Sequence, residues 1–70
     1  MTNRLVIHLP DQSIHLVSDS FDKLNTVSAF CKKELGAYHA SEDIDDLTVD
    51  TLNNEMSDKL HSLLFKLDLH

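Results

Sequence analysis

The residues best suited to chemistry in this 70-residue chain are five histidines, one cysteine and twelve acids. His8 and His15 occupy the middle of two Ile-His-Leu triplets, and two imidazoles can hold zinc or copper when a third or fourth ligand joins them. The sequence offers no further donor at a defined spacing. We therefore expect His8 and His15 to form a polar pair on a solvent-exposed surface, with no bound metal and no cofactor.

Cys31 is the only cysteine, and it falls on an apolar helical stripe between Val27 and Leu35. A nucleophilic thiol needs a nearby base and an electropositive, partly open setting, and His39 is the nearest base along the chain. We expect Cys31 to pack in the core as a small apolar side chain. One cysteine cannot close an internal disulfide, which is typical of proteins from a reducing compartment.

Five acids gather between positions 42 and 50, and oxygen ligands of this kind suit calcium. These acids are Glu42, Asp43, Asp45, Asp46 and Asp50. A calcium loop beginning at Asp43 would place Thr48 where glycine is required and Asn54 where the bidentate glutamate belongs, so the pattern fails. A single glycine also excludes a glycine-rich phosphate loop, and so short a chain offers little room for a shielded cleft. We predict that the protein is not an enzyme.

The formal net charge of −6 lies entirely in residues 41–70, because residues 1–40 hold four basic and four acidic side chains. An acidic surface repels phosphate backbones and anionic membranes, and it attracts basic protein surfaces. We therefore expect a protein partner with a basic surface, and neither nucleic acid nor a membrane. No apolar run approaches the roughly 18 residues that span a bilayer, and no signal peptide is evident, so a cytoplasmic location is expected.

Residues 4–17 predict a β-hairpin that turns at Pro10-Asp11-Gln12-Ser13. The matching triplets predict cross-strand pairs between Leu9 and Ile14, His8 and His15, Ile7 and Leu16, and Val6 and Val17. Because side chains alternate along a strand, one face is apolar and the other carries Val6, Val17 and both histidines. The apolar residues are Leu5, Ile7, Leu9, Ile14 and Leu16.

The apolar spacing then becomes helical and predicts a helix over residues 20–35, capped by Asp19 or Ser20 and ended by Gly36. An acidic connection over 37–47 follows, with Tyr38 at an edge of the core. A second helix is predicted over 49–67, with Thr48 or Asp50 at its start. Its apolar stripe contains Val49, Leu52, Met56, Leu60, Leu63, Leu64 and Leu67. The predicted fold is a single small α+β domain in which a hairpin packs against two helices, in the order ββαα.

The opening RLVIHLPD also resembles the start of ribbon-helix-helix regulators, in which a short strand ending in Leu-Pro-Asp leads into a helix. That resemblance implies a dimer whose paired strands enter the DNA major groove. The residues facing the DNA would be Arg4, Val6 and His8, which are poorly suited to reading bases. The first helix would also have to run through residues 18–20, Ser-Asp-Ser, which is weakly helix-forming.

The leading functional hypothesis is a small acidic protein that binds another protein and modulates it. Short acidic chains without catalytic motifs are common among inhibitors from phages and plasmids, including DNA mimics and anti-CRISPR proteins. The alternative is a dimeric ribbon-helix-helix regulator or antitoxin with an acidic partner-binding half. Phe65 lies off the apolar stripe of the second helix, so we expect it to act with the acids as a contact residue, toward the target or a second copy. The expected contact residues are Glu42, Asp43, Asp45, Asp46, Asp50 and Phe65.

Overall fold

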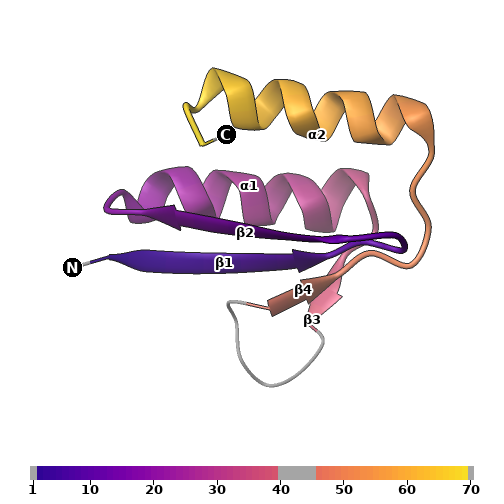
Figure 1. Cartoon of the computed structure of the whole chain (residues 1–70), viewed down its shortest axis with the longest axis horizontal. Helices are drawn as coiled ribbons and strands as arrows, with labels where there is room; N and C mark the ends of the chain where they lie inside the picture. Colours follow the sequence, from indigo (N-terminus) through magenta and orange to yellow (C-terminus); the bar gives the residue numbers. More distant parts are fainter. Residues whose placement is uncertain (1, 40–45, 70) are drawn as a thin grey trace.

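The computed structural model describes residues 2–39 and 46–69, which form a four-stranded sheet and two helices (Figure 1). The elements are β1 (Asn3–His8), β2 (Ser13–Ser18), α1 (Phe21–Glu34), β3 (Tyr38–His39), β4 (Asp46–Thr48) and α2 (Asn54–Lys66). The α+β class is therefore confirmed. The order ββαα is correct only in part, because β3 and β4 lie between the two helices.

The predicted hairpin is present as β1 and β2, but its register differs from the prediction. Ile7 pairs with Ile14 and Leu5 with Leu16, so the partners are shifted by two residues. The turn is tighter than expected, because the Leu9 amide donates to the Gln12 carbonyl at 2.7 Å and leaves only Pro10 and Asp11 between them. A shift of two residues keeps every side chain on its predicted face, since strand side chains alternate with period two.

Helix α1 begins and ends where the sequence predicts. The Ser20 side chain accepts a hydrogen bond from the Lys23 amide at 3.4 Å and so caps the first turn. Gly36 follows the helix with φ of 67°, and the Ala37 amide donates to the Cys31 carbonyl at 3.0 Å. A glycine in this left-handed conformation is the expected way to end a helix.

Strands β3 and β4 occupy a segment that was predicted to be a connection. Strand β4 pairs in parallel with β1, matching Leu47 with Ile7, and β3 pairs antiparallel with β4, which gives the sheet order β2-β1-β4-β3. The Val49 amide extends this pairing by donating to the His8 carbonyl at 2.8 Å. Leu47 and Val49 are fully buried, so they belong to the sheet side of the core. The predicted start of the second helix at Thr48 or Asp50 is therefore wrong.

Helix α2 begins at Asn54, and the Asn53 side chain caps it by accepting a hydrogen bond from the Met56 amide at 2.8 Å. Leu60 and Leu64 are buried in one cluster with the inner side chains of the sheet and of α1. Both helices thus lie on the same face of the sheet, as Figure 1 shows. Phe65 is 73% exposed, which confirms that it lies off the apolar stripe.

The ribbon-helix-helix prediction for the fold is wrong. Residues 13–18 form a strand that pairs with β1 of the same chain, whereas that family would require a helix here. The intramolecular hairpin places Ile14 and Leu16 beside Ile7 and Leu5 on one face, and this face is covered by the helices.

Candidate protein-interaction surface

Among residues 2–39 and 46–69, both helices pack on one face of the sheet, and we call the opposite face the open face. Strand alternation assigns its members from the register. They are Arg4, Val6, His8, Ser13, His15, Val17, Tyr38, Asp46 and Thr48. Val6 lies on this face of the central strand β1, between His15 and Asp46, and is only 5% exposed although it lies outside the helix-covered core.

His8 and His15 share the open face, as predicted, but they do not face each other. His8 is paired with Ser13, and its Nδ1 lies 3.2 Å from the Ser13 hydroxyl. Its Nε2 lies 3.8 Å from the Asp46 carboxylate across the β1–β4 boundary. His15 is paired with Val6. The contact between His8 and Asp46 is partly solvent-exposed, and such pairs contribute little to stability.

Tyr38 and Asp50 form the most clearly defined polar contact on this side of the molecule. The Tyr38 hydroxyl donates to Asp50 Oδ1 at 2.9 Å, and this hydrogen bond to a carboxylate raises the pKa of Tyr38 above its ordinary value. The Tyr38 side chain is nevertheless 48% exposed. Tyr38 was expected at an edge of the core, and the structure instead holds it as an aromatic ring fixed at its hydroxyl and open to solvent.

The predicted contact residues separate into two groups. Asp46 begins β4 on the open face, and Asp50 lies just beyond β4 against Tyr38. Phe65 belongs to α2, in the layer on the other side of the sheet, so it does not share a surface with these two carboxylates. Glu42, Asp43 and Asp45 lie outside the described residues.

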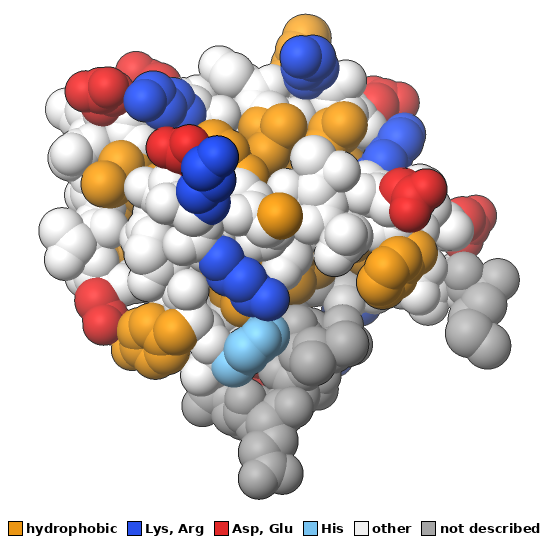
Figure 2. All heavy atoms as spheres, turned by 180° about the vertical axis from the view of Figure 1, so that it is seen from behind, with side chains coloured by type: hydrophobic (Ala, Val, Ile, Leu, Met, Phe, Trp, Pro, Cys, Tyr) orange, Lys and Arg blue, Asp and Glu red, His pale blue; other side chains and the backbone are white. Residues whose placement is uncertain are grey.

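The net negative charge of the chain comes from residues outside its helices. Helices α1 and α2 together contain five lysines and four acids, which gives them a net charge of +1. Because the whole chain has a net charge of −6, the residues outside the helices carry a net charge of −7. Figure 2 views the molecule from behind, and Lys or Arg side chains lie among Asp or Glu side chains across the face seen there. The second half of the chain carries the whole formal charge, yet α2 itself is neutral by this count.

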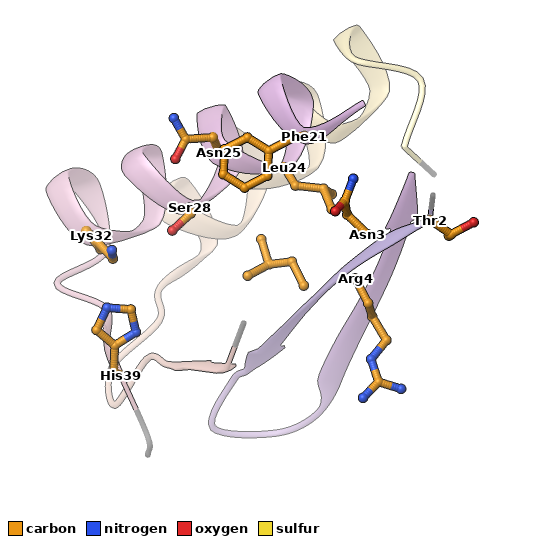
Figure 3. A pocket seen from close by; sticks show the side chains of 10 residues that line it. Thr2, Asn3, Arg4, Phe21, Leu24, Asn25, Ser28, Lys32 and His39 are labelled. Atoms are coloured by element: carbon orange, nitrogen blue, oxygen red, sulfur yellow. The ribbon is translucent and has the colours of Figure 1, made fainter. Parts of the chain in front are cut away.

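A cavity of about 410 Å³ lies between the first half of β1 and α1, with His39 of β3 at one end (Figure 3). It is lined by Thr2, Asn3, Arg4, Leu5, Phe21, Leu24, Asn25, Ser28, Lys32 and His39. The Arg4 side chain points away from the cavity in Figure 3. These lining residues include no carboxylate and no thiol; they supply basic, neutral polar and apolar side chains.

Cys31 is fully buried in the core, which confirms its predicted place on the inner stripe of α1. Burial raises the pKa of its thiol to about 11, so the thiolate is disfavoured at neutral pH. Within residues 2–39 and 46–69, no three His, Cys, Asp or Glu side chains come together as a metal site. No helix in the same ranges is long and apolar enough to cross a bilayer.

Comparison with known proteins found no matching family model, no matching curated protein and no matching solved structure. What the chain does is therefore inferred from its own residues.

Proposed function

We propose that this protein binds a partner protein with a basic surface, and that it makes contact through the β3–β4 side of the open face. The observation that carries the proposal is the Tyr38–Asp50 pair, an exposed aromatic ring whose hydroxyl is held by a carboxylate. Asp46 adds a second carboxylate at the other end of β4. Binding would modulate the partner by covering part of its surface.

Tyrosine suits such a contact because it buries a large area with few rotatable bonds. The hydrogen bond to Asp50 restricts the ring further, so less side-chain entropy is lost on binding. Residues of this kind at the centre of an interface account for a large share of its binding free energy. Tyr38 takes the role that the sequence assigned to Phe65, since Tyr38 and the two described acids lie on the same side of the sheet.

The charge distribution supports a basic partner. The helices are close to neutral and the strands are neutral by the same count, because Arg4 balances Asp46, so the excess of acids belongs to the connections and the C-terminal end. Exposed carboxylates raise the association rate with a cationic surface, and this gain is lost as salt screens the charges. An inhibitor that mimics DNA is the narrower form of the proposal, and in that case DNA competes with the protein for the same partner.

The test compares two variants that remove the same charge from different faces. Asp50→Asn removes a carboxylate beside Tyr38 while keeping an oxygen that accepts the hydroxyl hydrogen bond, and Asp58→Asn removes an exposed carboxylate from α2. A partner is captured from a host lysate, identified by mass spectrometry and purified, and its Kd is measured by calorimetry at low and high salt. We expect Asp50→Asn to weaken binding about tenfold at low salt, which corresponds to roughly 1.4 kcal/mol, and Asp58→Asn to leave it nearly unchanged. Equal effects of the two variants, or none, would contradict the proposal.

A further inference from the structure

Strand β2 forms an outer edge of the sheet, and half of its backbone groups point away from the molecule. The sheet order places β1 on one side of β2, and no described strand lies on the other. Two hydrogen bonds show which way the backbone groups of β1 point. The Leu9 amide donates to the Gln12 carbonyl on the β2 side, and the His8 carbonyl accepts from the Val49 amide on the β4 side. Odd-numbered residues of β1 bond to even-numbered residues of β2, so the amides and carbonyls of Ser13, His15 and Val17 face outward.

This edge has none of the features that usually prevent edge strands from pairing. Exposed edges are commonly protected by charged side chains, proline or a bulge. The sequence of β2 is SIHLVS, which contains no lysine, no carboxylate and no proline. Its pairing with β1 runs without interruption from Ser18 to Ser13, so there is no bulge. Val17 is 58% exposed.

The edge is complementary to itself. When two copies of β2 run antiparallel about a two-fold axis at His15, Ser13 of one copy faces Val17 of the other, and His15 faces its own equivalent. All three residues with outward backbone groups then lie in hydrogen-bonded pairs. The same register sets Ile14 against Leu16 of the second copy on the inner face, where both residues already contact the helix-covered core. A shift by two residues in either direction leaves some outward groups without a partner.

We infer that β2 pairs with β2 of a second copy of this chain, which joins the two four-stranded sheets edge to edge in a symmetric dimer. The fit to a second copy follows from the register, because one two-fold axis satisfies the backbone and aligns the apolar residues at once. The open faces of both copies then lie on the same side of one continuous sheet. The inference is independent of the proposed partner, since β2 and the Tyr38 side lie at opposite edges of the sheet.

Charge gives this dimer a characteristic salt dependence. The strand itself contains no lysine, arginine or carboxylate, but Asp11 and Asp19 flank it, and the two-fold axis brings the like charges of two acidic chains closer together. Added salt screens this repulsion, so self-association strengthens as salt rises. Binding to a basic partner weakens under the same change. The opposite salt dependences therefore distinguish self-association from binding to the partner.

The experiment is sedimentation velocity of the full chain from about 1 to 500 µM, a range over which mass action shifts a weak dimer. Val17→Lys places a charge on the edge, and Val17→Thr is the matched control without charge. His15→Pro removes one outward amide, and proline is tolerated at an edge where the amide faces solvent. Phe65→Ala tests whether α2 mediates association instead.

We expect a dimer for the wild type, Val17→Thr and Phe65→Ala, and a monomer for Val17→Lys and His15→Pro. The melting temperature of Val17→Lys should match that of the wild type measured in the monomeric range. If His15→Pro fails to fold, Val17→Lys decides the matter alone. A wild type that stays monomeric over the whole range, or a Val17→Lys variant that dimerises as well as the wild type, would overturn the inference.

Discussion

The buried thiol of Cys31 makes the stability of the protein sensitive to alkaline pH. Its pKa is raised from 9.0 to about 11 in the folded chain, so between these values the folded state holds a proton that the unfolded state has released. The stabilisation is fully present below pH 9, and it is lost as the pH rises towards 11. Two pKa units correspond to roughly 2.7 kcal/mol, which is large against the roughly 3.5 to 10 kcal/mol typical of a domain this size.

Urea unfolding of the wild type and of Cys31→Ala at a series of pH values from 8 to about 10.5 measures this contribution. All other titratable side chains are the same in both proteins, so the difference between the two curves isolates the thiol. The alanine variant should begin less stable, since it leaves a small cavity at a fully buried site, and the gap should shrink or reverse at high pH. Parallel curves would show that the thiol is not desolvated as described.

Three further expectations follow from the same structure. Gly36→Ala should lower the free energy of unfolding by about 1 kcal/mol through backbone strain alone, because φ is 67° and a Cβ there would meet nothing within 4 Å. An unchanged urea midpoint would contradict the role of Gly36 as the helix cap. Leu60→Ala should cost about 2 to 5 kcal/mol and Phe65→Ala less than about 0.5, and equal losses in calorimetry would mean that α2 packs through another face. Asp50→Asn should lower the pKa of Tyr38 towards its ordinary value. Absorbance at 295 nm measures the ionisation of Tyr38 directly, because it is the only tyrosine and the chain has no tryptophan.

The parts of the fold predicted correctly depend on local signals. Helix α1 has a cap, an apolar stripe and a terminal glycine within one segment, and each of these acts between near neighbours. The hairpin follows from two matching triplets around Pro10. Its register was missed because the two triplets align residue for residue only across a four-residue turn, whereas the chain turns at Pro10-Asp11 and pairs Ile7 with Ile14.

Strand β4 was missed because its partner lies far away in the sequence. The segment Asp46-Leu47-Thr48-Val49-Asp50 alternates strictly between polar and apolar residues, which is a strand signal. Val49 also fits the helical stripe that continues to Leu52 and Met56, so the same residues support both interpretations. Parallel pairing with β1 selects the strand, and no local feature of the sequence indicates that pairing.

In the candidate site, too, local features were predicted from the sequence and long-range contacts were not. The acids were identified from composition, but their relation to an aromatic residue was not. Tyr38 and Asp50 are brought together by the antiparallel pairing of β3 with β4, which the sequence did not predict. Phe65 was expected to be exposed from its helical position, and it is, but the sheet separates it from Asp46.

The most direct test of the proposed binding surface compares two exposed aromatic residues in one assay. Tyr38→Ala removes the ring beside Asp50, which is 48% exposed, and Phe21→Ala removes a ring that is 59% exposed from the start of α1. Calorimetric titration of the purified partner with each variant at low salt should show Tyr38→Ala weakening binding at least tenfold, by roughly 1.4 kcal/mol or more, while Phe21→Ala stays within about twofold of the wild type. An undiminished affinity in Tyr38→Ala, or an equal loss in both variants, would contradict contact through the Tyr38 side of the open face.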